Sequence, residues 1–175
     1  FQNIEIFEGN YLTKEFVVVS SQLDAKYILP NTNIDTTSIR VSVTDGETGT
    51  VEVYNAYENI FQVNSESRLF LIQEVNDEKY QILFGDGVLG KKPPNGSTIK
   101  VSYIVTNGAD GNGASNFNFS GNLAYPRRSG DTIVDTPVTQ NVSLLTVSQA
   151  SENGDNIEPV DNVKYLAPRV YASQY

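Results

Sequence analysis

The sequence of 175 residues contains no histidine, cysteine, methionine or tryptophan. Histidine is the side chain best suited to proton transfer near neutral pH and the commonest metal ligand, so its absence excludes most familiar catalytic constellations. Without cysteine there is no disulfide framework to interpret. We therefore expect a protein that is not an enzyme, with no catalytic residue, no cofactor and no metal ion.

Positive charge is also scarce. Lys and Arg number 12 against 21 Asp and Glu, which gives a formal net charge of −9. Binding to nucleic acid depends on clustered cations that neutralise phosphates, so neither DNA nor RNA is an expected partner. No apolar run approaches the roughly 18 residues of a membrane span, and no signal segment opens the chain. Because the chain starts at Phe1 and lacks methionine, we interpret it as a segment of a longer protein.

Short alternating runs rich in Val, Ile, Thr, Tyr and Phe, separated by Asn, Asp, Gly and Pro, predict a mainly β fold built of antiparallel hairpins. Ser38–Val43 is predicted to be a half-buried strand, with Val51–Tyr54 as its expected returning partner. Arg68–Val75 and Lys79–Phe84 are expected to form a second hairpin around the turn Asn76–Glu78. These runs favour a β-rich domain over residues 1–150.

Further strands are predicted on either side of these hairpins. Asn3–Glu8 and Lys14–Ser20 are expected to form a hairpin with Gly9-Asn10 at its tip, where positive φ is tolerated. After Asn95-Gly96, a strand places Ile99, Val101, Tyr103 and Val105 on one face. Pro137–Gln149 resumes the alternation as another strand.

Two segments depart from the strand pattern. Residues 107–135 are rich in Gly, Asn and Ser and are expected to form a long loop, with Phe117, Phe119 and Tyr125 as anchors for a neighbouring surface. The basic pair Arg127-Arg128 belongs to the same candidate interface and suits an acidic partner. Over residues 158–175 the period becomes helical, and Pro168 divides this segment into short helices.

The stretch FGDGVLGKKPP, residues 84–94, poses the question of a phosphate-binding loop. Gly85 and Gly90 have the Walker separation and Lys91 follows, but position 92 is Lys rather than Ser or Thr. Two prolines and a strand come next, so no helix dipole would point at a phosphate. We expect Phe84, Gly85, Asp86, Gly87 and Gly90 to form a shaped turn between two strands, with Lys91 and Lys92 at its tip facing an acidic neighbour.

Other candidate sites are weaker. Asp110 and Asn112 alternate with glycine as in calcium loops, but the third oxygen ligand and the closing Glu are missing. A carbohydrate-binding or adhesin-like β-sandwich is the alternative function, because 10 Tyr and 8 Phe could supply stacking platforms. The absence of Trp weighs against it.

The segment YQILFGDGVLGKKPPNGSTIKVSYIVTNGADGNGASNF, residues 80–117, resembles the core of the baseplate-J-like family of contractile-tailed bacteriophages. NVKYLAPRVYASQY, residues 162–175, is similar to the helical Ala-Pro segment of that family. LPNTNIDTTSIRVSV and FLIQEVNDEKYQILFGDG resemble baseplate wedge proteins of T-even-type phages. The chain would then be the middle fragment of such a protein, whose parent chain is α+β overall.

The resemblance implies a structural role in the virion, at the tail baseplate, after assembly in the cytoplasm of the bacterial host. Proteins of this family form the inner baseplate ring, pair with copies of themselves and hold other wedge proteins. The ring rearranges when the tail sheath contracts. No catalysis is attributed to this region of the family, and the expected partners are therefore wedge proteins and a second copy of the chain.

Overall fold

The computed structural model describes residues 6–19, 26–57, 63–116, 149–156, 158 and 164–165, together with the backbone of two strands within 123–138. The chain divides into two compact units. Unit 1 comprises Phe1–Gly108 and Asn156–Tyr175, and unit 2 comprises Ala109–Asp155. The boundary falls just inside the predicted loop, so the expected domain of residues 1–150 contains parts of both units.

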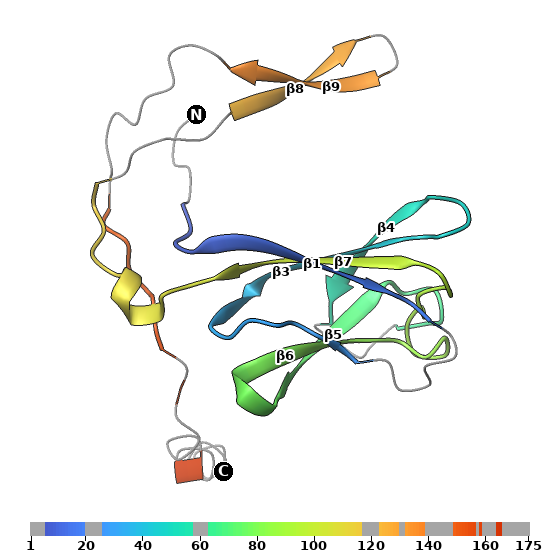
Figure 1. Cartoon of the computed structure of the whole chain (residues 1–175), viewed down its shortest axis with the longest axis horizontal. Coiled ribbons are helices and arrows are strands. Elements are labelled where there is room, and N and C mark those ends of the chain that lie inside the picture. The colour runs from blue at the N-terminus through green and yellow to red at the C-terminus, as the bar shows by residue number, and fades with distance from the viewer. Residues whose placement is uncertain are drawn as a thin grey trace. The chain divides into compact units, whose positions relative to one another are not determined.

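Unit 1 is built on a seven-stranded sheet in the order β1-β7-β3-β4-β5-β6-β2 (Figure 1). Its strands are β1 Asn10–Val17, β2 Tyr27–Ile28, β3 Ile34–Thr44, β4 Val51–Ala56, β5 Leu69–Val75, β6 Lys79–Phe84 and β7 Thr98–Val105. Most neighbours pair antiparallel, but β4 and β5 pair parallel over two residues. The predicted mainly β fold is confirmed, as a mixed rather than purely antiparallel sheet.

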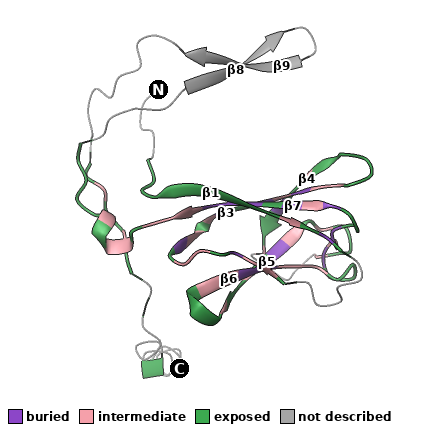
Figure 2. Cartoon of the chain, in the orientation of Figure 1, coloured by how far each residue is buried: buried purple, intermediate pink, exposed green. Residues whose placement is uncertain are grey.

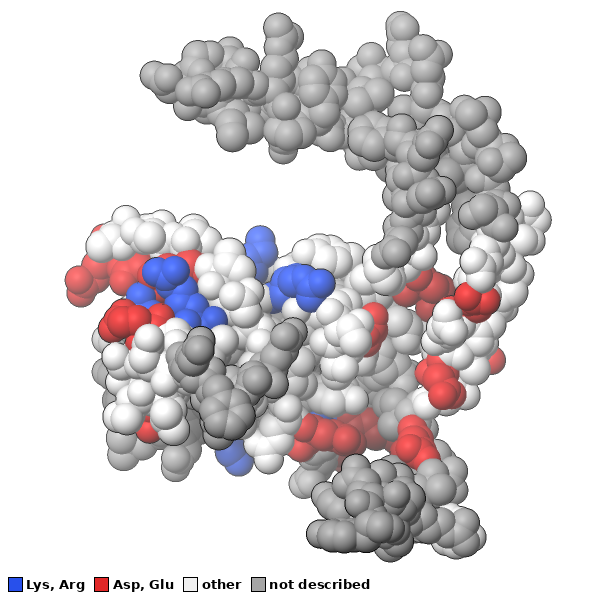
Figure 3. Space-filling view, turned by 180° about the vertical axis from the view of Figure 1, so that it is seen from behind, with Lys and Arg blue, Asp and Glu red and all other residues white. Residues whose placement is uncertain are grey.

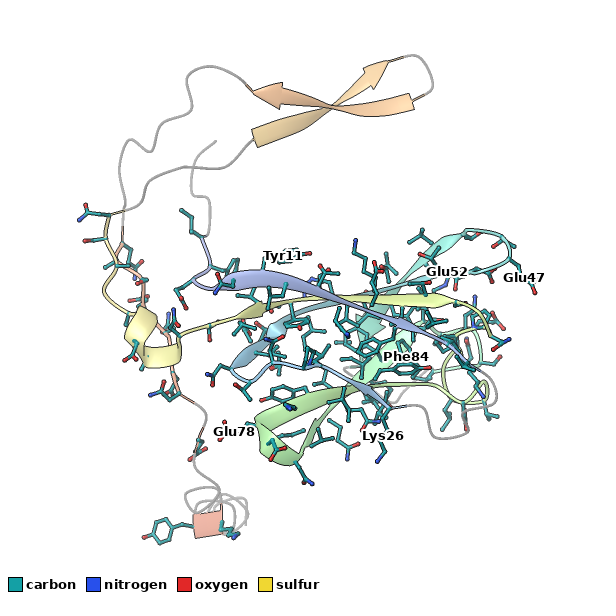
Figure 4. All side chains as sticks on the ribbon, in the orientation of Figure 1. Tyr11, Lys26, Glu47, Glu52, Glu78 and Phe84 are labelled. Atoms are coloured by element: carbon teal, nitrogen blue, oxygen red, sulfur yellow. The ribbon has the colours of Figure 1, made fainter. Side chains whose placement is uncertain are left out.

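The sheet is folded into two layers (Figure 1), with β1, β7, β3 and β4 in one and β5 and β6, continued by β2, in the other. Aromatic rings connect the layers. Phe16 of β1 packs edge-on against Tyr27 of β2, with ring centroids 5.6 Å apart. Tyr27 and Tyr54 each contact Phe84, at 5.7 and 5.4 Å. Figure 4 shows Phe84 between the two layers. The two end strands of the sheet therefore approach one another through side chains.

The core lies between the layers and is formed mainly by β3 and β7, with contributions from β4, β5 and β6 (Figure 2). The alternation predicted for β7 is confirmed: Ile99, Val101 and Tyr103 are buried and Val105 packs against them. The largest fully buried side chains include Tyr54 and Tyr103. Burying aromatic rings of this size contributes several kcal/mol in total, about 2 to 3 kcal/mol each.

Both predicted central hairpins are present. β3 pairs with β4 from Val41 opposite Tyr54 to Thr44 opposite Val51. β5 pairs with β6 over six residue pairs. β5 and β6 are connected by a single 3-10 turn, η1 Asn76–Glu78, in which Asp77 adopts φ 64°. Asp tolerates this left-handed backbone better than most residues, whereas Glu78, which adopts φ 55°, has no such preference.

The predicted N-terminal hairpin is wrong. Residues 10–13, expected in its turn, belong to β1, and β1 pairs along its whole length with β7. The sequence of β1 does not alternate between polar and apolar residues, and its unbroken pairing with β7 from Asn10 to Val17 is what makes it one continuous strand. Gly9 precedes the strand because a Cβ there would lie 2.6 Å from the carbonyl oxygen of Val105. Glycine is needed at position 9 because the backbone approaches β7 closely there, and not because position 9 is the tip of a hairpin.

Unit 2 contains the hairpin of β8 Leu123–Ser129 and β9 Thr132–Val138. The interpretation of 107–135 as a loop is therefore wrong for the residues in β8 and β9. The strands could not be recognised from the sequence because the segments that flank them are rich in Gly and Asn. The 3-10 turn η2 Gly108–Gly111 begins at Gly108 of unit 1, and its other three residues belong to unit 2. The strand predicted for Pro137–Gln149 coincides with β9 only at its first two residues, and residues 139–148 lie outside the described part of the chain.

A short neck closes the described part of unit 2. The side-chain amide of Asn112 donates to the carbonyl oxygen of Gly154 at 2.8 Å and accepts from the N–H of Gly154 at 2.8 Å. Ser151 extends this contact, because its N–H donates to Ala114 and its carbonyl accepts from Gly113. Two chain segments about forty residues apart are thus fixed side by side. The predicted helices of 158–175 lie almost entirely outside the described residues.

Candidate functional site

The FGDGVLGKKPP motif occupies the connection between β6 and β7, as predicted. Asp86 organises its turn: the carboxylate oxygen Oδ1 accepts hydrogen bonds from the N–H groups of Val88 at 2.8 Å and Leu89 at 2.9 Å. These backbone bonds hold the pKa of Asp86 below its ordinary value. Gly87 adopts φ 93°, a conformation that other residues rarely adopt, and donates to the carbonyl of Gly90 at 3.0 Å.

Gly85 and Gly90 close the base of this turn. A Cβ on Gly85 would overlap the backbone carbonyl of Gly90, so no side chain fits between the two ends of the loop. Gly90 is buried and has φ 90°. The strand β7 follows after Pro94, where a phosphate-binding loop would need a helix. The glycines of the motif therefore serve backbone geometry.

The motif is fixed to a neighbouring turn. The N–H of Gly90 donates to the carbonyl of Asn64 at 3.0 Å, and the N–H of Lys91 donates to the carbonyl of Ser67 at 2.7 Å. The Asn64 turn is itself closed by its side chain, which accepts from Glu66 N–H at 2.9 Å and the Ser67 hydroxyl at 3.1 Å. Two loops therefore brace each other, which makes the motif a rigid projection.

Ion pairs strengthen the same junction. The Lys91 ammonium lies 2.7 Å from both carboxylate oxygens of Glu52 on β4, and the Arg68 guanidinium lies 2.9 Å from Glu52 Oε1. Figure 4 labels Glu52 on β4, and Figure 3 shows acidic and basic side chains gathered together at one end of the sheet. The bond from Lys91 is the main cause that holds the pKa of Glu52 below its ordinary value. Lys91 thus has an acidic neighbour, as expected, but that neighbour lies within its own chain, and the Lys91 side chain is 25% exposed rather than projecting at the tip.

A shallow depression of about 170 Å³ lies beside this cluster, lined by Val43, Asp45, Thr48, Thr50, Glu52, Lys91 and Pro94. Small-molecule sites usually enclose roughly 300 to 1,000 Å³. The charged groups here already have partners: Asp45 Oδ1 accepts from Glu47 N–H at 2.9 Å and from Thr48 N–H at 2.8 Å. The depression therefore offers a ligand little unused hydrogen-bonding capacity.

At the tip of the motif, Val88 and Leu89 are 73% and 63% exposed. Sequence reasoning missed this pair. The available signal was two aliphatic residues between glycines in a turn, where no strand alternation would bury them. Fixed on a braced loop, they form an apolar contact point that loses little conformational freedom when a partner covers it. We call Val88 and Leu89 the loop tip.

The predicted interface residues are only partly placed. Phe117 and Phe119 lie outside the described residues, and Tyr125, Arg127 and Arg128 lie on β8, where the structure describes the backbone alone. Their role in binding stays a prediction. Asp110 and Asn112, weighed as calcium ligands, lie in or beside η2. In the described part of the chain, no three acidic side chains come together to hold a metal ion.

Within the described residues, no helix is both long and apolar enough to cross a bilayer. The fold and the site define a β-sheet module that presents braced loops. No protein-family model matches the sequence. The chain is similar to the baseplate wedge protein gp6 of Enterobacteria phage T4, at 25% identity over 138 residues. The match covers 70% of this chain and 20% of gp6, so the chain spans about a fifth of that protein's length.

Proposed function

We propose that this chain is a structural part of a bacteriophage tail baseplate wedge, of the baseplate-J-like type, and that it holds neighbouring wedge proteins in the inner baseplate ring. Its place is the tail baseplate of the virion. It acts without catalysis, through contacts with neighbouring proteins that rearrange together with the ring when the sheath contracts. The similarity to the T4 wedge protein supports the baseplate role, and the resemblance of its motifs to the family supports the finer assignment, including pairing with a second copy.

The observation that carries a contact role is the loop tip. Val88 and Leu89 are held out from a loop that is hydrogen-bonded to the Asn64–Ser67 turn and ion-paired to Glu52. The buried centre of a protein interface is depleted of charged residues, and a contact point that is already fixed in place loses less conformational entropy on binding. Each contributes about 1.5 kcal/mol or more when a partner covers it.

The test is binding to purified baseplate proteins of the same phage, measured by sedimentation and biolayer interferometry. The double variant Val88→Asp with Leu89→Asp should weaken binding at least about tenfold, because two carboxylates replace the apolar contact. Leu71→Asp on β5, a residue that is 47% exposed, is the matched control and should bind as the parent does. Equal affinity of the double variant and the parent would contradict a role for the loop tip.

The second candidate contact region is the segment 107–135, and its contribution is tested separately. Removing residues 115–150 and joining Ala114 to Ser151 through a short glycine linker retains the neck. The β-sheet of unit 1 should remain folded and assembly should weaken. If the shortened chain forms rings at the same rate as the parent, the contacts needed for assembly lie outside the removed segment. The carbohydrate-binding alternative stays a prediction, which a glycan array tests.

A further inference from the structure

β1 is the last strand of its sheet and has β7 as its one hydrogen-bonded neighbour among the described strands. It is eight residues long, whereas β2 at the opposite end has two. Figure 2 shows β1 exposed along nearly all of its length. A long end strand whose outer edge pairs with no other described strand offers a row of backbone donors and acceptors to an additional strand.

The direction of those backbone groups follows from the contacts of Val18. Its N–H donates to Ser97 and its carbonyl accepts from Gly96, both at 2.9 Å, so both groups of Val18 face the β7 side. Because this orientation alternates along a strand, Phe16, Lys14 and Leu12 face β7 as well. The N–H and C=O groups of the residues between them face the free edge. These residues are Tyr11, Thr13, Glu15 and Val17.

The side chains of β1 define what an added strand must carry. Leu12, Lys14 and Phe16 share the face that points toward the second layer, and the Lys14 ammonium lies 5.8 Å from the centre of the Phe16 ring. Within the described residues, no carboxylate pairs with Lys14. On the other face, Glu15 lies opposite Lys100 of β7, a residue of opposite charge. Lys14 is therefore the charge on β1 that an added strand would meet uncompensated.

Lys14 also argues against a second copy of β1 that is paired so that the apolar residues of the two strands match. An antiparallel pair of β1 strands that matched Leu12 with Phe16 would place Lys14 opposite Lys14, and like charges in that position are destabilising. An acidic residue opposite Lys14 would be stabilising instead. With its backbone groups turned to β7, Lys14 would form a non-hydrogen-bonded pair with the new strand, where opposite side chains are closest.

We propose that the free edge of β1 binds an extended segment of another polypeptide, in which an acidic residue opposite Lys14 is flanked two positions away on each side by apolar residues facing Leu12 and Phe16. The proposal identifies the surface, and the kind of partner segment, through which the chain would act in assembly. It rests on the proposed function only because it requires a protein partner. It does not involve the loop tip.

The probe is the peptide acetyl-Thr-Val-Thr-Glu-Thr-Val-Thr-amide, compared with the same peptide carrying Lys at its centre. In ¹H–¹⁵N spectra of the complete chain, the Glu peptide should shift the amides of β1, most strongly Thr13 and Glu15, and slow their exchange with solvent. The Lys peptide should bind about twofold to fivefold more weakly. The variant Lys14→Glu should reverse this preference, whereas Lys92→Glu, which changes the net charge equally, should leave it intact.

Several outcomes would overturn the proposal. No shift in β1 at millimolar concentrations of either peptide would do so, as would binding without charge preference. Amides of Thr13 and Glu15 already protected in the free protein would mean that the chain covers this edge itself. Shifts that depend on protein concentration alone would assign the edge to a second copy. Because the loop-tip variants leave β1 unchanged, loss of assembly in those variants with normal peptide binding separates this inference from the proposed function.

Discussion

Two buried tyrosines should respond in opposite directions to the loss of their hydroxyl groups. Tyr54 is 2% exposed and its Oη atom has no hydrogen-bond partner within the described part of the chain. Tyr103 is 1% exposed, and its hydroxyl lies 2.7 Å from Oδ1 of Asn31, to which it donates. Both rings lie in the same core, so the two Tyr→Phe substitutions differ in hydrogen bonding more than in packing.

A buried hydroxyl without a partner costs about 1 to 3 kcal/mol, because water satisfies that group in the unfolded chain. Tyr54→Phe should therefore raise the free energy of unfolding by about 1 kcal/mol and the Tm by roughly 2 to 4 °C. Tyr103→Phe removes a short hydrogen bond and leaves Asn31 Oδ1 without its donor. It should lower the free energy of unfolding by about 1 kcal/mol.

Urea denaturation followed by tyrosine fluorescence and by circular dichroism measures both variants, and the m-value shows whether the unfolded state has changed. The expected separation between the variants is about 2 kcal/mol. A loss of stability in Tyr54→Phe similar to that in Tyr103→Phe would refute the reasoning. It would show that the Tyr54 hydroxyl makes a hydrogen bond in solution.

Further predictions concern pH, backbone and charge. Burial raises the pKa of Tyr54 to about 12, so the free energy of unfolding is unaffected by this group below pH 10 and falls as pH rises toward 12, where the unfolded chain ionises first. In Tyr54→Phe the free energy of unfolding should fall less over this pH range. Gly85→Ala should cost about 3 kcal/mol or more in chemical denaturation, whereas Gly49→Ala, with positive φ but open space around it, should cost about 1 kcal/mol. Glu52→Gln should lower stability by about 1 kcal/mol near neutral pH. This deficit should shrink as pH falls through the lowered pKa of Glu52, and a pH-independent deficit in thermal scans would contradict it.

Local signals in the sequence were sufficient where partners are close along the chain. The β5–β6 hairpin could be predicted because Asn76–Glu78 supplies its turn and the flanking runs are apolar. The turn role of Asp86 and Gly87 was also readable, since both residue types favour that geometry. The core face of β7 followed from alternation alone.

Partnerships across long sequence separation could not be read in the same way. β1 resembles one half of a local hairpin, and only the sheet shows that it pairs with β7. Lys91 and Glu52 form an ion pair although they are 39 residues apart, and no rule based on sequence spacing predicts such a pair. The exposure of Val88 and Leu89 depends on how the loop is braced by Asn64 and Ser67. Side-chain placement of this kind depends on tertiary contacts rather than on periodicity.

The pairing of β1 with β7 also has a consequence for synthesis on the ribosome. Thr13 and Ser102, whose hydroxyls meet at 3.2 Å, are 89 residues apart. At translation rates of roughly 5 to 20 residues per second, β1 leaves the ribosome on the order of 4 to 18 s before its partner strand exists. The hairpins β3–β4 and β5–β6 can form during that interval, whereas β1 must wait. The first strand to be made is therefore among the last to join the sheet, and a chaperone that covers nascent extended segments should find its target there.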